Sequence, residues 1–535
     1  MVVIGSGFAG LWAALGAARR LDELAVPAGT VDVMVVSNKP FHDIRVRNYE
    51  ADLSACRIPL GDVLGPAGVA HVTAEVTAID ADGRRVTTST GASYSYDRLV
   101  LASGSHVVKP ALPGLAEFGF DVDTYDGAVR LQQHLQGLAG GPLTSAAATV
   151  VVVGAGLTGI ETACELPGRL HALFARGDGV TPRVVLIDHN PFVGSDMGLS
   201  ARPVIEQALL DNGVETRTGV SVAAVSPGGV TLSSGERLAA ATVVWCAGMR
   251  ASRLTEQLPV ARDRLGRLQV DDYLRVIGVP AMFAAGDVAA ARMDDEHLSV
   301  MSCQHGRPMG RYAGCNVIND LFDQPLLALR IPWYVTVLDL GSAGAVYTEG
   351  WERKVVSQGA PAKTTKQSIN TRRIYPPLNG SRADLLAAAA PVQRPRSEHG
   401  CHALVLGRGR SAGRLRASGV HPDWHRNHRR CPSPGAPTWP AGRPRQRRRR
   451  RRAAALPGTG DLSAQSRDLC TCPYRAAHQQ QRHHAAGYTH GAGRRRQHHV
   501  DGPPIDGWPY PGQARAVGGG TVAAAGRLRC ALVCR

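Results

Sequence analysis

Two glycine-rich segments have the residue types and spacing needed to bind a phosphate-bearing cofactor. In each, a run of apolar residues leads into Gly-x-Gly-x-x-Gly and then into a helical run. The first glycine allows a tight turn, the second lets a pyrophosphate approach the backbone, and the third lets the helix lie close to the strand. The N-terminus of that helix faces the phosphate charge. The glycines are Gly5, Gly7 and Gly10 in the first segment and Gly154, Gly156 and Gly159 in the second.

A single motif of this kind is weak evidence, because glycine clusters are common in turns. Here two copies start at Gly5 and Gly154, and each lies between a predicted strand and a predicted helix. The second strand, residues 149–153, is almost entirely valine, a β-branched residue typical of buried strands. The pair of motifs therefore predicts a protein that binds two dinucleotides.

The residue that ends the next strand selects the nucleotide. After the second motif, the strand at residues 183–187 ends at Asp188. A carboxylate there can accept bonds from both ribose hydroxyls and would repel a 2′-phosphate, so the site is predicted to prefer NAD(H) over NADP(H). After the first motif, the strand at residues 31–36 ends in Ser37 and Asn38 instead of an acid. One of these two side chains is expected to bond the ribose less strongly.

With these motifs, three further segments make the chain resemble the flavin-dependent pyridine nucleotide oxidoreductases. Residues 99–104, ending at Gly104, are similar to the segment where the chain leaves the first domain in that family, and residues 243–248 are similar to the return crossing. Residues 282–287, ending in Gly286-Asp287, resemble the second flavin motif. The resemblance implies that the Asp bonds the ribityl and diphosphate region of FAD. An alternative for Asp287 is a helix N-cap.

Within this superfamily the chain is most similar to type II NADH dehydrogenases and to flavoproteins resembling apoptosis-inducing factor. Residues 154–166 are similar to their Gly-x-Gly-x-x-Gly-Val-Glu-x-Ala-x-Glu-Leu helix, whose first Glu lies near the nicotinamide and the flavin. That residue is Glu161 here; the alternative is a first-turn acid that complements the helix dipole. By the same resemblance Gln304 or His305 lies near the flavin pyrimidine and the acceptor face; the alternative is a simple helix entry.

The resemblance implies an enzyme that passes hydride from NADH to FAD and electrons on to a small quinone-type acceptor. The first three glycines, Ser37, Gly104, Gly286 and Asp287 would hold FAD, and the second three glycines with Asp188 would hold NADH. Glu161, Gln304 and His305 are the candidate catalytic residues. Two alternatives are a ferredoxin- or rubredoxin-type reductase and a non-enzymatic protein that senses NADH or binds nucleic acid.

The cysteines argue against a disulfide reductase. Such members of the superfamily carry a C-x4-C or C-x2-C redox pair, whereas Cys56 and Cys164 stand alone and Cys303 and Cys315 are twelve residues apart. The core therefore lacks the thiol relay needed to reduce a disulfide. Lone cysteines suit a reducing cytosol. No zinc-module spacing is present either, and no metal site is predicted.

The predicted fold class is α/β, with two Rossmann-like dinucleotide-binding domains, a small α+β C-terminal cap and a disordered basic tail. Both flavin motifs must meet in one sheet, so the FAD domain is expected to be discontinuous. Its parts are residues 1–112 and 255–325, with the NAD domain at 113–254 between them. The cap is expected at 326–391 and the tail at 392–535. Strands are predicted at 334–338 and 345–347, and a short helix at 383–390.

The net charge of +17 is concentrated in the tail. Residues 392–535 contain 27 Arg, no Lys and six acids, or +21, which leaves −4 for residues 1–391. The core is therefore not expected to bind nucleic acid. The tail is either a basic arm for phosphate or anionic lipid or the product of out-of-frame translation of GC-rich DNA; the second interpretation is favoured.

Neither a membrane-spanning helix nor a signal peptide is predicted. The expected location is the cytoplasm, with peripheral contact at the inner face of the membrane as a further expectation. Type II dehydrogenases usually end in amphipathic helices that dock there. In this sequence the tail begins where those helices are expected, so they are predicted to be missing or replaced.

Overall fold

The first parallel sheet joins strands that are far apart in the sequence. The computed structural model describes residues 1–174 and 180–391, so the predicted tail at 392–535 lies outside the described residues. The sheet has the strand order β21-β9-β1-β2-β5, and every pairing in it is parallel. Its strands are β1 (Val2–Ile4), β2 (Met34–Ser37), β5 (Ala70–Thr73), β9 (Leu99–Leu101) and β21 (Met282–Ala284). The segment carrying the second flavin motif thus pairs directly with the strand that precedes Gly104.

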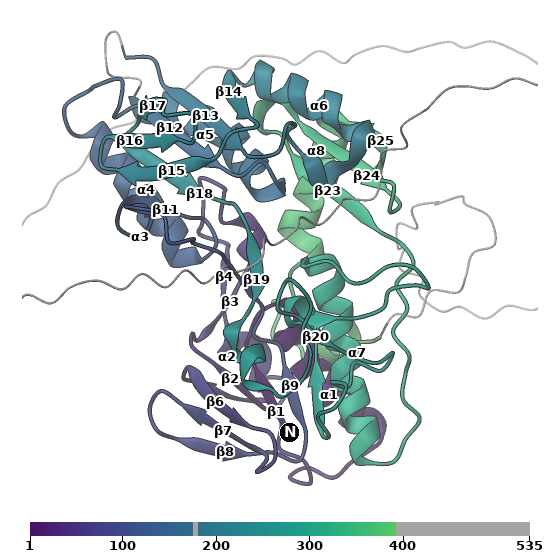
Figure 1. Cartoon of the computed structure of the whole chain (residues 1–535). Helices are drawn as coiled ribbons and strands as arrows, with labels where there is room; N and C mark the ends of the chain where they lie inside the picture. Colours follow the sequence, from purple (N-terminus) through teal and green to yellow (C-terminus); the bar gives the residue numbers. More distant parts are fainter. Residues whose placement is uncertain (175–179, 392–535) are drawn as a thin grey trace, which may run out of the picture. The chain divides into compact units, whose positions relative to one another are not determined.

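Two helices, α1 (Phe8–Glu23) and α7 (Cys303–Leu321), pack on this sheet and against each other (Figure 1). Glycines make the contact very close: a Cβ added to Gly310 or Gly314 would lie 2.2 Å from the Ala9 carbonyl oxygen or 2.0 Å from that of Ala13. The two helices therefore meet through backbone atoms.

The second parallel sheet repeats this plan with the order β11-β18-β12-β13-β14. All five residues of β12 are buried, as its β-branched sequence predicts. The strands are β11 (Gly119–Phe120), β12 (Thr149–Val153), β13 (Arg183–Asp188), β14 (Val214–Thr218) and β18 (Thr242–Trp245). The helices that connect these strands are α4 (Tyr125–Ala139), α5 (Leu157–Phe174) and α6 (Gly198–Asp211). Two parallel sheets with crossover helices confirm the α/β fold class with two Rossmann-like units.

Smaller sheets, antiparallel apart from the last strand pair given below, and short helices complete these two units. Three-stranded sheets are formed by β6 (Val76–Asp80), β7 (Arg85–Thr88) and β8 (Ser93–Ser95), and by β15 (Val222–Ser226), β16 (Gly229–Leu232) and β17 (Arg237–Ala239). The strand pairs are β3 (Phe41–Asp43) with β4 (Arg57–Pro59), β10 (Ser105–Val107) with β19 (Met249–Ala251), and β20 (Leu268–Gln269) with β22 (Ala289–Ala290). The short helices are α2 (Leu60–Leu64) and α3 (Leu115–Phe118).

The last described segment forms an antiparallel sheet followed by helices. The strands β23 (Val335–Asp339) and β24 (Ala345–Glu349) lie close to the two predicted strands, whereas the third strand, β25 (Lys354–Gln358), was not predicted. The helices are α8 (Gly359–Ser368), a π-helical turn (Ile369–Arg373) and α9 (Arg382–Ala388). The sequence indicated α9 but not α8, whose ten residues include only four apolar ones, none larger than proline. Among the described residues no helix is both long enough and apolar enough to cross a membrane.

Candidate functional site

Both glycine motifs form the same backbone turn. Gly5 and Gly154 have φ of +100° and +104°, in the left-handed region that favours glycine. A Cβ on Gly10 would lie 1.9 Å from the Gly5 carbonyl oxygen, and one on Gly159 would lie 1.7 Å from that of Gly154. The protein's own packing therefore requires the first and third glycine of each motif.

The middle glycine behaves differently in both copies. A Cβ added to Gly7 would meet nothing within 4 Å, and one added to Gly156 would meet only the Asp196 carboxylate at 3.9 Å. Gly7 is also the N-cap of α1 and caps it with no side-chain hydrogen bond, so the first N–H groups of the helix have no acceptor there. Open space beside the N-terminus of the helix fits a pyrophosphate at each loop.

The buried carboxylate of Asp188 lies against the second glycine loop. Its Oδ2 accepts a hydrogen bond from the backbone N–H of Ala155, and its Oδ1 accepts one from Asn190 at 2.7 Å. Both bonds fix the carboxylate at the end of β13, the position from which a ribose is bound in Rossmann folds.

Ser37 takes the matching place at the end of β2. Its buried hydroxyl lies 2.7 Å from the Lys39 carbonyl oxygen and 3.0 Å from Nε2 of His71. Because the Lys39 carbonyl can only accept, the Ser37 hydroxyl donates to it. The imidazole of His71 then donates to Ser37, and a second lone pair on the serine remains for a ligand hydroxyl.

Asp287 follows Gly286, which packs against Ala9 of the first glycine helix. Its Oδ2 accepts a hydrogen bond of 2.6 Å from the Ser105 hydroxyl and lies 3.8 Å from the Arg45 guanidinium. Burial raises the pKa of Asp287, although Ser105 and Arg45 act in the opposite direction. Asp287 is inside a single 3-10 turn, Gly286–Val288, whose N-cap is Ala285, so the N-cap alternative is wrong. Gly104 and Gly286 both have positive φ, and the position of a Cβ on Gly286 would be 2.7 Å from the Cβ of Ala9.

Glu161 forms a buried ion pair with Lys366, which the sequence did not indicate. Nζ of Lys366 donates to Oε1 of Glu161 at 2.7 Å, and the two side chains are only 10% and 9% exposed. Burial raises the pKa of Glu161 despite the lysine. Burial pushes the pKa of Lys366 down, but Glu161, with smaller contributions from Asp339 and Cys303, raises it, and the net shift is upward. No acid lies in the first turn of α5, so the alternative of a first-turn dipole partner is wrong.

Gln304 and His305 lie in the first turn of α7, and both contact the backbone. The Gln304 side-chain amide bonds both polar groups of Val335: its Nε2 donates to the carbonyl oxygen at 2.8 Å and its Oε1 accepts from the N–H at 3.2 Å. Gln304 thus holds the start of β23, which a simple helix entry does not explain. His305 is fully buried, its Nδ1 accepts from the N–H of Val300, and burial lowers its pKa to about 4. The ring is therefore neutral, and its buried Nε2 has no hydrogen-bond partner among residues 1–174 and 180–391.

Sequence reasoning missed the residues around the Glu161 pair: Tyr49, Asp339, Lys363 and Lys366. They come from three segments, and Lys366 lies 205 positions from its partner. The only local signal was the spacing of Lys363 and Lys366, which places two lysines on one face of a helix.

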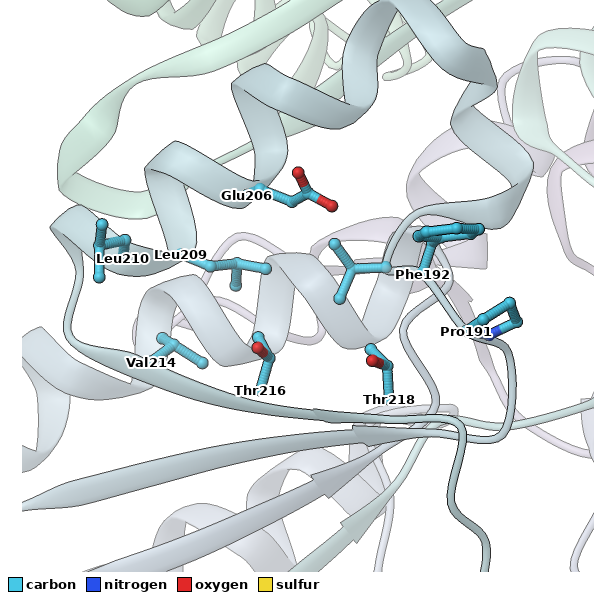
Figure 2. A pocket seen from close by; sticks show the side chains of 9 residues that line it. Pro191, Phe192, Glu206, Leu209, Leu210, Val214, Thr216 and Thr218 are labelled. Atoms are coloured by element: carbon cyan, nitrogen blue, oxygen red, sulfur yellow. The ribbon is translucent and has the colours of Figure 1, made fainter.

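A cavity of about 210 Å³ lies between α6 and β14 and is also lined by residues 191–193, which follow Asp188 (Figure 2). Figure 2 shows Glu206 and Leu209 above it and Thr216 and Thr218 below it. Its lining combines six apolar residues with the two threonines, and Glu206 is its charged side chain.

The family profile described as "Pyridine nucleotide-disulphide oxidoreductase" matches residues 1–310, more than half of the chain. The chain belongs to this family. A NADH dehydrogenase-like protein from Mycobacterium tuberculosis is 99% identical to this oxidoreductase over 396 residues, which are 74% of the chain and 99% of the relative. The type II NADH:quinone oxidoreductase of the same species is 30% identical over 320 residues, which are 54% of the chain and 67% of the relative.

Among solved structures, this oxidoreductase is similar to NDH2 from Plasmodium falciparum in complex with NADH. The TM-score is 0.58 at 14% identity, and the match covers 72% of this chain and 97% of the other. At that identity the likeness supports the fold. The family description contains the word "disulphide", but residues 1–391 contain no C-x2-C or C-x4-C pair. All five cysteines of the described residues are free in this structure.

Proposed function

We propose that this oxidoreductase is an FAD-dependent NADH dehydrogenase that delivers electrons to a quinone-type acceptor. The observation that carries the proposal is the pair of open glycine loops, each with an acid beside it: Asp287 at the first and Asp188 at the second. FAD in the first loop would supply the hydride-accepting and electron-carrying chemistry. NADH in the second loop would supply the hydride. The names of the relatives, NADH dehydrogenase-like protein and type II NADH:quinone oxidoreductase, agree with this assignment.

We further propose that the first sheet carries FAD, with domain parts at 1–112 and 255–325, and that the second carries NADH, with the domain at 113–254. The pairing of β21 with β9 supports the discontinuous first domain. In this assignment Asp287 would accept a ribityl hydroxyl and Asp188 would accept the ribose hydroxyls of NADH. Gln304 and His305 would frame the flavin indirectly, by holding β23 and the loop at Val300 in place.

The quinone part of the proposal is supported by the buried Glu161–Lys366 pair. A protonated lysine in a site that excludes water can donate to a carbonyl oxygen that gains negative charge, and electrostatic stabilisation of this kind is strong at low dielectric. Glu161 keeps that lysine charged despite its burial. A one-electron protein acceptor would have no need of such a proton donor.

The experiment is a half-reaction assay on the full-length chain loaded with FAD. Anaerobic NADH should bleach the flavin absorbance, and a short-chain quinone should restore it. If the enzyme reduces ferredoxin or rubredoxin faster than it reduces the quinone, the result favours the ferredoxin- or rubredoxin-type reductase instead. A chain that cannot be loaded with FAD, or whose flavin NADH does not bleach, would overturn the proposal. Asp287→Asn, compared with Asp62→Asn on the exposed face of α2, tests whether the first acid holds FAD.

A further inference from the structure

Charged and hydroxyl side chains continue outward from the Glu161–Lys366 pair. Oδ1 of Asp339 accepts hydrogen bonds from Nζ of Lys363 at 2.5 Å and from the N–H of Gly341 at 2.9 Å. Its Oδ2 accepts a longer bond, 3.4 Å, from the hydroxyl of Tyr49. Nζ of Lys366 lies 5.8 Å from the centre of the Tyr49 ring. Tyr49 therefore contacts the outer pair, Lys363 and Asp339, through Asp339, and its ring lies near Lys366 of the inner pair.

Only the outer end of this series is open to solvent. The Lys363 side chain is 26% exposed, Asp339 is 10% exposed, and Lys366 and Glu161 are 10% and 9% exposed. Lys363 is thus the member that meets solvent, and the other members, Tyr49 included, are buried. Two acids and two lysines that are mostly buried are expected to add little to the free energy of unfolding, because the cost of desolvating the charges offsets most of their attraction.

The hydroxyl of Tyr49 is suited to pass a proton. Burial raises its pKa well above the ordinary value, and the carboxylates of Glu161 and Asp339 raise it further. The hydroxyl therefore stays protonated while it lies within electrostatic range of both acids. Asp339 itself is faced by titratable groups from three segments: Lys363 and Lys366 of α8, Glu161, Cys164 and Glu165 of α5, and Tyr49.

The proposed reaction requires a proton from water. NADH, a quinone and one proton give NAD⁺ and a quinol. The hydride brings two electrons and one proton, so the second quinol proton must come from solvent. A site from which water is excluded needs side chains to carry that proton.

We propose that Lys363, Asp339 and Tyr49 form a relay that carries this proton from solvent to the Glu161–Lys366 pair. The inference rests on the proposed function. Each transfer breaks one N–H or O–H bond and forms another. The proton that reaches the quinone oxygen is replaced along the series and finally from water at Lys363. These residues act through the inner pair and do not contact the acceptor.

The test measures the two half-reactions separately in the FAD-loaded chain by stopped flow. In Asp339→Asn, Lys363→Met and Tyr49→Phe, bleaching by NADH should stay near the wild-type rate. Reoxidation by a short-chain quinone should slow about 100-fold, the lower part of the range for a lost proton-transfer group. The solvent deuterium isotope effect on reoxidation should rise, and Asp339→Glu should restore part of the rate.

Matched controls are Asp62→Asn, Lys354→Met and Tyr94→Phe, which change the same residue types outside the series. Retained FAD and an unchanged melting temperature show that a variant is folded. Reoxidation within twofold of wild type in the three relay variants, with an unchanged pH profile and isotope effect, would overturn the relay. If NADH bleaches the flavin of the wild-type chain but no quinone reoxidises it, the quinone acceptor is refuted instead. That result is visible before any variant is made.

Discussion

The backbone N–H of Asp339 donates a hydrogen bond to Oε1 of Glu161 at a distance of 3.1 Å. This bond ties the end of β23 to the helix that follows the second glycine loop. The start of β23 is tied to α7 by the Gln304 amide. One short strand therefore connects the helices of the two proposed cofactor sites, and Glu161 has a structural role besides its proposed part in quinone reduction.

The Glu161–Lys366 pair should be strongly coupled. Lys366→Met leaves a buried carboxylate without its partner, and Glu161→Gln leaves a buried ammonium, so each should cost about 3–5 kcal/mol of unfolding free energy. The double variant should cost much less than the sum, as measured by urea denaturation of the four proteins. Strictly additive costs would show that the pair does not interact. Lys354→Met, at an exposed pair with Glu352, should leave stability unchanged.

Replacing the middle glycines should separate ligand binding from folding. Gly7→Ala should fold with the wild-type melting temperature when no FAD is present, because its Cβ meets nothing within 4 Å. It should lose FAD affinity, since the methyl group would occupy the space proposed for the pyrophosphate. Gly156→Ala should do the same for NADH. Gly10→Ala serves as the contrast, because its Cβ would clash with the Gly5 carbonyl oxygen and the protein itself should be destabilised. Unchanged FAD affinity in Gly7→Ala would remove the first loop from the cofactor site.

Asp188→Arg should shift the nucleotide preference from NADH towards NADPH. The carboxylate that repels a 2′-phosphate is lost, and a guanidinium that can pair with it is gained. The ratio of kcat/KM for the two nucleotides should change by about tenfold or more, equivalent to about 1.4 kcal/mol. Asp211→Arg, at the exposed end of α6, is the control. An unchanged ratio would remove Asp188 from the ribose site.

Two buried histidines should make the protein less stable in mild acid. Burial lowers the pKa of His42 and of His305 from 6.5 to about 4. Above pH 6.5 each histidine is neutral in both the folded and the unfolded protein, and the stability is fully present. As the pH falls from 6.5 towards 4, the unfolded protein binds the proton and the folded protein does not, so stability is lost. Each ring should contribute a slope of about 1.4 kcal/mol per pH unit in this window. Urea denaturation at several pH values should show a shallower slope for His42→Gln than for wild type; equal slopes would contradict the assignment.

The sequence was informative wherever function depends on a local backbone turn. Gly5 and Gly154 could be assigned because a tight turn with positive φ leaves a sequence signature. Asp188 could be assigned because it ends a strand at a known offset from the second loop. The sequence could not point to Lys366, Asp339 and Tyr49. These residues are brought together by the tertiary packing of α8, β23 and the segment that contains Tyr49. Such contacts join residues with no fixed spacing, and α8 itself lacks the large apolar residues that mark a helix by its periodicity.

The contact of Gly310 and Gly314 with the backbone of Ala9 and Ala13 has a mechanical consequence. FAD is a long ligand, and in the proposed assignment its diphosphate lies at the start of α1 while its ring system lies near the start of α7. Because the two helices touch through main-chain atoms, no side-chain rotamer can adjust, and the distance between those two helix ends is fixed. A single methyl group added at this contact would push the helices apart and misalign both ends of the ligand.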